Sequence, residues 1–389
     1  MTKQNTSTFI RGYVEGYYGK LLTFRERLEI TQCLSSLDLN TFCYAPKEDP
    51  QHRLNWRESH SSQWHKSFAD FCTDARGMDV SVIAGIAPGL DFQFNTQANS
   101  PDTSTDFDHL QRKTQQYLQA GATEILILWD DIDDNFNQKI SISEGTAHAR
   151  TVNQLSDALG RPLWTVPRVY ANEIENKDNY LEDFFTELKP QHTVLLCGKA
   201  IVASSVQYSD LTQLGKNTTD KPQSLKHRTV VWDNFYANDY CPRRLFIGPW
   251  TGRTDINEYL INPTGLPFTD KLIMEIVSAT HGVQHSTEAW HKVLKRHGVP
   301  DAFLHIADYF LQPCFGDHQA TVQPDCALPT AEVEQAIEEC LWRWKSALAR
   351  EWYPFIMSLK HDLALMQNIL ATDRILKTQT PGLAKRLLL

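Results

Sequence analysis

The 389-residue sequence has no hydrophobic run long enough to cross a membrane. Its longest strongly apolar run covers residues 125–129, whereas a membrane-spanning helix needs roughly 20 apolar residues. Residues 1–8 are polar (MTKQNTST), so the N-terminus lacks the apolar segment of a secretory signal. These absences predict a cytoplasmic protein without a membrane partner.

Paired cysteine motifs and basic clusters are also missing. The eight cysteines include no CxxC pair and no Cys/His spacing typical of a metal site, so we interpret them as free thiols of a cytoplasmic protein. The formal net charge is −9, without a block of Lys or Arg. Because an acidic surface repels phosphate backbones, we do not expect a nucleic-acid partner.

Eight short apolar runs alternate with amphipathic stretches over the first 265 or so residues. These runs lie at residues 9–15, 41–44, 80–86, 124–129, 163–166, 193–196, 229–232 and 259–261. Helical patterns follow at about 24–37, 63–76, 107–120, 144–159 and 180–188, and Thr23 and Glu26 form a capping box before the first. No GxGxxG motif follows the first run, which disfavours a dinucleotide-binding sheet. The alternation predicts a closed (β/α)₈ TIM barrel over residues 1–267.

Beyond residue 268 the pattern is helical only, which predicts a C-terminal all-α domain over residues 268–389. Stretches 331–348 and 349–370 have helical periodicity, with an expected interruption near Pro354. We interpret the aromatic stripe in this region as core or as a homodimer interface. Its members are Trp342, Trp344, Trp352 and Tyr353.

Four carboxylates stand directly after the fourth apolar run, at 130, 131, 133 and 134. Catalytic residues of such barrels lie where strands end. Crowded carboxylates can raise one another's pKa, so that one remains an acid while its neighbour is ionised. This division of labour suits glycoside cleavage. A solvated acidic loop and a metal site are the alternatives, although neither His-x-His nor a calcium-loop spacing accompanies the cluster.

Other strand ends carry residues suited to binding a sugar. Gly16 and Tyr18 follow the first run, and Lys47 follows the second. Trp232, Asn234 and Asp239 follow the seventh, and Asn262 follows the eighth. Asn, Asp and Trp offer hydrogen bonds and a stacking surface for a pyranose ring. Each residue alone has an ordinary turn-forming explanation. Together with the carboxylates after the fourth run, at five strand ends in all, they predict one binding site.

Eight motifs resemble glycoside hydrolase family 84, which contains O-GlcNAcases and bacterial β-N-acetylglucosaminidases. They are RGYVEGYYG at 11–19, YAPKED at 44–49, HRLNWR at 52–57, PGLD at 88–91, WDDID at 129–133, VWDN at 231–234, ANDY at 237–240 and RLFIGP at 244–249. The resemblance runs in order from about residue 9 to 265. The chain departs from the family pattern at 168–169 and at 196–197, where it has Arg-Val and Leu-Cys.

The resemblance implies retaining hydrolysis of terminal β-linked N-acetylglucosamine (GlcNAc), in which the substrate's own acetamido oxygen forms an oxazoline. Asp130 would then polarise the acetamido group, and Asp131 would act as acid and base. The remaining implied contacts are Gly16, Tyr18, Lys47, Asp133, Tyr170, Trp232, Asn234, Asp239 and Asn262. No cofactor or metal is implied, and the partner would be a GlcNAc-bearing glycoprotein, peptide or glycan. A sugar-binding pseudoenzyme and a metal-dependent hydrolase are the rival hypotheses.

Overall fold

The computed structural model describes residues 9–94, 104–133, 141–212, 226–313 and 330–366. Within them, eight parallel strands close into one barrel in chain order, β1 to β8, with β8 pairing β1. The strands are β1 Arg11–Glu15, β2 Thr41–Tyr44, β3 Ser81–Ile86, β4 Glu124–Leu128, β5 Trp164–Val166, β6 Thr193–Leu196, β7 Arg228–Asp233 and β8 Tyr259–Ile261. The predicted (β/α)₈ TIM barrel is therefore confirmed.

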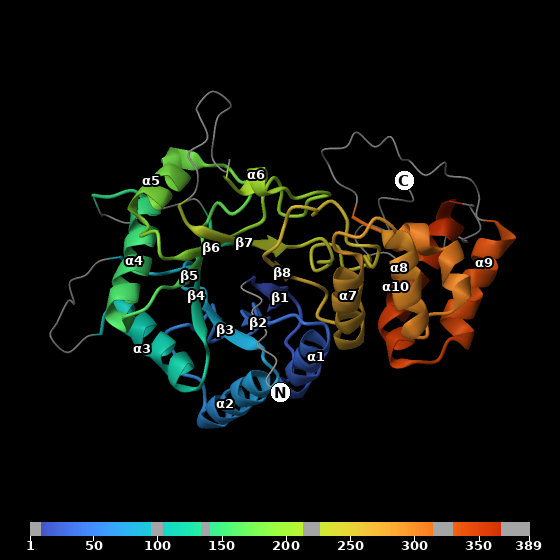
Figure 1. Ribbon diagram of the computed structural model, residues 1–389, viewed down its shortest axis with the longest axis horizontal. Helices are drawn as coiled ribbons and strands as arrows, with labels where there is room; N and C mark the ends of the chain where they lie inside the picture. The colour runs from blue at the N-terminus through green and yellow to red at the C-terminus, as the bar shows by residue number, and fades with distance from the viewer. Residues whose placement is uncertain (1–8, 95–103, 134–140, 213–225, 314–329, 367–389) are drawn as a thin grey trace, which may run out of the picture.

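Helices surround the barrel on its outer side (Figure 1). They are α1 Phe24–Ser36, α2 Ser62–Gly77, α3 Asp106–Gln119, α4 Glu144–Leu159, the 3₁₀ turn η1 Lys177–Asn179, α5 Tyr180–Glu187, the short α6 Tyr208–Thr212 and α7 Pro267–Thr280. The predicted capping box of Thr23 and Glu26 opens α1. Residues 234–258, between β7 and β8, contain no helix. This long connection leaves room for binding residues at the mouth of the barrel.

The strands separate two apolar clusters by the alternation of their side chains. On β4, Leu126 and Leu128 belong to the cluster inside the barrel, whereas Ile125 and Ile127 pack outward toward the helices. All four are fully buried. Strands buried on both faces have no polar alternation, which explains why the sequence showed them as short continuous apolar runs.

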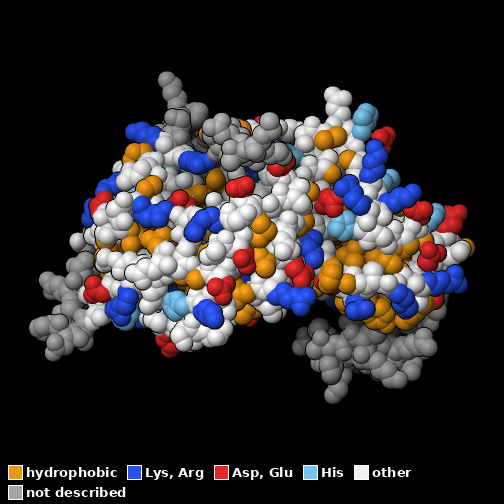
Figure 2. Space-filling view, turned by 60° about the horizontal axis from the view of Figure 1, so that its bottom comes forward, with side chains coloured by type: hydrophobic (Ala, Val, Ile, Leu, Met, Phe, Trp, Pro, Cys, Tyr) orange, Lys and Arg blue, Asp and Glu red, His pale blue; other side chains and the backbone are white. Residues whose placement is uncertain are grey.

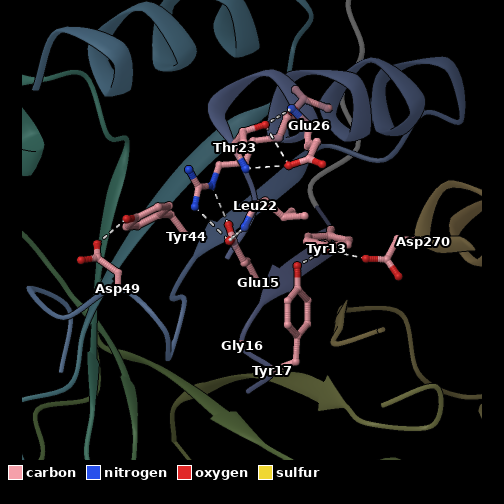
Figure 3. Close-up of polar contacts among 12 residues, drawn as sticks. Tyr13, Glu15, Gly16, Tyr17, Leu22, Thr23, Glu26, Tyr44, Asp49 and Asp270 are labelled. Carbon is pink, nitrogen blue, oxygen red and sulfur yellow. Dashed lines mark hydrogen bonds and ion pairs between the residues drawn. The ribbon is translucent and has the colours of Figure 1, made fainter. Parts of the chain in front are cut away.

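A buried ion pair fixes the carboxyl end of β1 to α1 (Figure 3). Glu15 accepts hydrogen bonds from Arg27 Nε at 2.7 Å, from Arg27 Nη2 at 2.9 Å and from the Leu22 amide at 3.1 Å. Burial raises the pKa of Glu15, and the charge of Arg27 only partly offsets this effect. The pair lies directly before Gly16 and so sets the position of the β1 loop.

Replacing Arg27 with Met should therefore lower the free energy of unfolding by about 3–5 kcal/mol, because it leaves Glu15 buried without its cation. Urea denaturation would measure the loss. Arg25→Met is the matched control on the same helix, since Arg25 pairs with Glu29 on the surface and such a pair contributes about 0.5 kcal/mol or less. Equal losses in the two variants would contradict this account.

The C-terminal part of the described chain is helical, as predicted. It contains α8 Ser286–Arg296, the 3₁₀ helices η2 Asp301–His305 and η3 Ala307–Phe310, α9 Ala331–Glu338, the π-helix η4 Glu339–Arg343 and α10 Ala347–Met366. α7 packs against both α1 and α8 and so belongs to the ring of barrel helices as well as to the helical part. The boundary at 267/268 coincides with the start of α7 and stays a prediction.

The predicted interruption near Pro354 is wrong. Pro354 lies inside α10, and the break falls earlier, at residues 344–346. A proline removes one helical hydrogen bond and can be accommodated when the surrounding helix is packed. Trp352, two residues away, is fully buried and makes an edge contact with Trp344 at 5.3 Å, which supports the helix on this side.

The aromatic stripe divides into buried and exposed members. Trp352 is core, as one of the two interpretations expected, whereas Trp342 and Tyr353 are exposed. Figure 2 shows hydrophobic side chains gathered on the lobe at the right, which the C-terminal helices form. The homodimer interface stays a prediction. No helix in the described ranges combines the length and apolar character that crossing a bilayer requires.

The cysteines that the structure describes are all free thiols, as predicted. Cys43, Cys72, Cys197 and Cys340 are buried, and Cys33 and Cys241 are partly buried. Cys314 and Cys326 lie outside the described residues.

Candidate active site

The residues at the barrel's mouth continue the inward-facing rows of the strands. On β4 the inward row of Leu126 and Leu128 leads to Asp130, and on β2 the row of Cys43 and Ala45 leads to Lys47. The same step of two residues leads from Val14 to Gly16, from Val230 to Trp232 and Asn234, and from Leu260 to Asn262. Strand alternation thus directs five strand ends toward one central space.

Asp131 does not belong to these inward-facing rows, but its backbone conformation turns its side chain toward the same space. Its φ is +53°, in the left-handed region that Asp tolerates better than most residues. The turn places both neighbouring carboxylates on the cavity side. Arg53, which is buried, secures it by donating from Nη2 to the Asp131 carbonyl at 2.6 Å and from Nη1 to the Asp130 carbonyl at 3.4 Å.

Asp130 lies at the floor of the cavity and is 6% exposed. Its Oδ2 accepts a hydrogen bond from Lys47 Nζ. Its Oδ1 is buried and has no hydrogen-bond partner among the described residues. A buried acceptor without a partner is costly, so this oxygen suits a ligand that brings a hydrogen-bond donor.

Asp131 is more accessible and has several partners. Oδ2 accepts from the Tyr18 hydroxyl at 2.8 Å, and Oδ1 accepts from the Tyr170 hydroxyl at 2.9 Å. Lys47 Nζ lies 3.4 Å from Oδ2. Burial raises the pKa of Asp131, but the charge of Lys47 and the two hydroxyl donors outweigh it and hold the pKa below its ordinary value. The crowding effect expected from the sequence therefore does not raise the pKa of Asp131, because a cation lies between the two carboxylates.

A hydrogen-bonded network of Trp and Asn side chains forms one wall of the cavity. Asn234 Oδ1 accepts from Trp232 Nε1 at 3.0 Å and from Asn262 Nδ2 at 2.9 Å. The Gly16 amide donates to Asn262 Oδ1 at 3.2 Å, and Asn234 Nδ2 donates to the Ile201 carbonyl at 2.9 Å. These bonds fix the orientation of the indole ring and join the loops after β1, β6, β7 and β8.

Together these residues enclose a cavity of about 560 Å³, a size suited to a small ligand. Ten of the eleven residues predicted for the site line it: Gly16, Tyr18, Lys47, Asp130, Asp131, Tyr170, Trp232, Asn234, Asp239 and Asn262. Asp239 Oδ2 accepts from the Tyr18 amide at 2.9 Å, which fixes one side of the rim. Asp133 is exposed and is not part of the lining, and Asp134 lies outside the described residues.

A family model described as beta-N-acetylglucosaminidase matches residues 11–278, which is more than half of the chain. The chain belongs to this family, glycoside hydrolase family 84. Membership places it among glycoside hydrolases of the β-N-acetylglucosaminidase type.

Curated relatives include the protein O-GlcNAcases of Rattus norvegicus and Mus musculus. Each is 32% identical over 255 residues, a match that covers 63% of this chain and 26% of the relative. The matched part thus spans about a quarter of the length of these relatives. Among solved structures, an O-GlcNAc hydrolase mutant of Thermobaculum terrenum has the same fold, with a TM-score of 0.73 and 21% identity over 95% of this chain and 85% of that one. A structure titled CpGH84B has a TM-score of 0.64 and 22% identity, and covers 77% and 53% of the two chains.

Some residues of the family 84 cavity were not predicted as site residues from the sequence. Glu173, Cys197, Ile201, Val202 and Tyr240 also line it. Cys197 and the two aliphatic residues come from the β6 loop, where the sequence departs from the family motif. Cys197 lies two residues beyond Leu195 on the inward row, which is the signal that could have identified it. Glu173 follows no strand register, and only the tertiary structure reveals it.

The described residues contain no cluster of three or more His, Cys, Asp or Glu side chains arranged to hold a metal ion. Lys47 occupies the space between Asp130 and Asp131 instead. The cavity therefore offers a buried carboxylate and ammonium group, a second and more accessible carboxylate, a wall of Trp and Asn side chains, and a rim with Tyr18 and Asp239.

Proposed function

We propose that this protein is a retaining exo-β-N-acetylglucosaminidase of the O-GlcNAcase type that uses substrate-assisted catalysis through an oxazoline. The observation that carries the proposal is the pair of adjacent carboxylates in one cavity with different partners. Within the described chain, one buried oxygen of Asp130 has no hydrogen-bond partner, whereas both oxygens of Asp131 accept hydrogen bonds from tyrosine hydroxyls. Two carboxylates in different environments suit two different chemical roles.

In this proposal Oδ1 of Asp130 accepts a hydrogen bond from the acetamido N–H of the bound GlcNAc. The bond makes the acetamido oxygen a better nucleophile, and this oxygen attacks the anomeric carbon. As the nitrogen becomes positive in the oxazolinium, the carboxylate lies where the charge develops. Holding the two reacting groups of the substrate in contact supplies the other large part of the rate.

Asp131 donates a proton to the leaving oxygen and then accepts one from the water that opens the oxazoline. In the free protein its contacts favour the carboxylate. The bound sugar and its leaving group replace Tyr18 or Tyr170 as partners, and removing those donors raises the tendency of Asp131 to hold a proton. Tyr170 then turns its hydroxyl to the acetamido oxygen or the oxazoline.

The remaining residues hold the sugar. Trp232 forms the wall beside the acetamido group, with its ring fixed by Asn234. Lys47, Asp239 and Asn262 bind ring hydroxyls, and Gly16 allows the ring to approach the backbone. We propose a glycoprotein, peptide or glycan bearing β-linked GlcNAc as the substrate, and a cytoplasmic location. The scheme needs no cofactor.

Hydrolysis of a chromogenic aryl β-N-acetylglucosaminide tests the proposal. We expect release of the phenol with initial formation of the β-anomer of GlcNAc, observed by proton NMR, and unchanged rates in the presence of a chelator. A thiazoline analogue of the oxazoline should inhibit strongly, because it resembles the intermediate. Sugar binding without turnover would instead indicate a pseudoenzyme, and loss of activity with a chelator would indicate metal-dependent hydrolysis.

A further inference from the structure

Glu173 lies on the loop that follows Tyr170 and contributes to the cavity lining. The loops after β5 and β6 are joined there by backbone bonds, from the Cys197 amide to the Tyr170 carbonyl at 2.8 Å and from the Asn172 amide to the Gly198 carbonyl at 2.9 Å. Glu173 Oε1 accepts from the Ile201 amide at 2.6 Å. This bond holds the carboxylate in place, although the residue is exposed.

No basic side chain pairs with Glu173 within the described part of the chain. Lys199, on the same loop as Ile201, lies 3.5 Å from Asp210 instead, and Lys47 is occupied by Asp130 and Asp131. Among the described residues, the cavity lining contains four carboxylates, Asp130, Asp131, Glu173 and Asp239, but only one cationic side chain, Lys47. Glu173 therefore presents a negative charge to whatever enters the cavity.

The depth of the residues indicates which part of a substrate meets this charge. Asp130 and Lys47 are buried at the floor, where the proposed function puts the GlcNAc ring. Glu173 lies toward solvent, on the loop of the tyrosine that contacts Asp131. In the proposed function Asp131 protonates the leaving group, so the leaving group lies beside Asp131, and Glu173 is three residues from Tyr170, whose hydroxyl donates to Asp131.

We infer that Glu173 is a specificity-determining residue that makes the enzyme favour aglycones with a positive charge next to the glycosidic bond, such as a peptide with Lys or Arg beside the glycosylated Ser or Thr. This inference rests on the proposed function. A charge at the rim of a binding site acts mainly through electrostatic complementarity, and its effect is screened by salt.

The test uses three synthetic peptides, each with one GlcNAc-modified Ser, that differ only in having Lys, Gln or Glu as the next residue. We expect kcat/KM to decrease in that order, with a Lys-to-Glu ratio on the order of 10-fold in low salt, since an exposed charge pair has an effect of about 2- to 5-fold and the exchange of Lys for Glu turns attraction into repulsion. Glu173→Gln keeps an oxygen for the Ile201 amide but removes the charge. For this variant the Lys-to-Glu ratio of kcat/KM should fall to about 2-fold or less.

Glu175→Gln is the matched control, because Glu175 is exposed on the same loop and is not part of the cavity lining. It should keep the wild-type ratio. The inference is overturned if Glu173→Gln leaves the Lys-to-Glu ratio of kcat/KM unchanged, or if Glu175→Gln lowers this ratio equally. The neutral aryl substrate separates the two proposals: if wild-type protein does not cleave it, the proposed function fails, and if it does while the peptide ratio is unaffected by Glu173→Gln, only the role of Glu173 fails.

Discussion

Replacing Asp131 with Asn should reduce kcat/KM by about 10²–10⁴-fold for a glycopeptide, but by a much smaller factor for an activated aryl glycoside. The range is that of general acid catalysis. An alkoxide from Ser or Thr needs a proton to leave, whereas a nitrophenolate leaves without one. Asp130→Asn should be poor with both substrates, because an amide in place of the carboxylate cannot stabilise the charge on the acetamido nitrogen.

The parameter kcat/KM isolates the step in which the oxazoline forms, so the role of Asp131 as base in the second step does not obscure the comparison. Across a series of aryl glycosides, kcat/KM of Asp131→Asn should fall steeply as the pKa of the leaving phenol rises, whereas kcat/KM of the wild type should change little. If kcat/KM of Asp131→Asn and of Asp130→Asn depended equally on the leaving group, the proposed roles of the two carboxylates would be wrong.

Replacing Gly16 with Ala should lower kcat/KM on the order of 10²-fold. A Cβ at this position would lie 2.2 Å from Trp232 Cζ2 and 2.7 Å from Cη2, so the indole ring has to move. Moving it strains its bond to Asn234 and the bond from the Gly16 amide to Asn262. A displacement of about 1 Å in residues that position a substrate can cost a rate factor of this size.

Gly77→Ala is the control for a glycine-to-alanine change, since a Cβ there meets no atom within 4 Å and α2 ends at this residue. It should leave activity unchanged and raise the free energy of unfolding by about 1 kcal/mol or less. Thermal unfolding of both variants would separate a local effect from general destabilisation, because overpacking costs typically 1–3 kcal/mol. Full activity in Gly16→Ala would show that Trp232 does not fix the sugar.

The observed elements agree closely with the sequence pattern for the barrel and less well for the C-terminal helices. Seven of the eight strands begin within one residue of the apolar runs, and α4 begins and ends as predicted. Two predicted positions differ from the structure by two residues or more. β1 starts at Arg11 and not at residue 9, and the helical break predicted near Pro354 lies earlier in the chain. Parallel strands buried on both faces have a strong local signal. The outcome of a proline inside a helix depends on tertiary packing, which the sequence does not display.

The sequence by itself determined which residues stand at the strand ends, because each follows its strand at a fixed spacing and alternation directs every second side chain inward. Gly16, Lys47, Asp130, Trp232, Asn234 and Asn262 belong to this group. The tertiary structure alone decided that Asp131 turns back into the cavity through a left-handed φ, and that Arg53 secures this turn. It also decided that Lys47 lies between the two carboxylates, which lowers the pKa of Asp131, and that the Ile201 amide of the β6 loop holds the carboxylate of Glu173. The physical reason is that strand register is a local property, whereas charges, loop contacts and burial depend on segments that are distant in the chain.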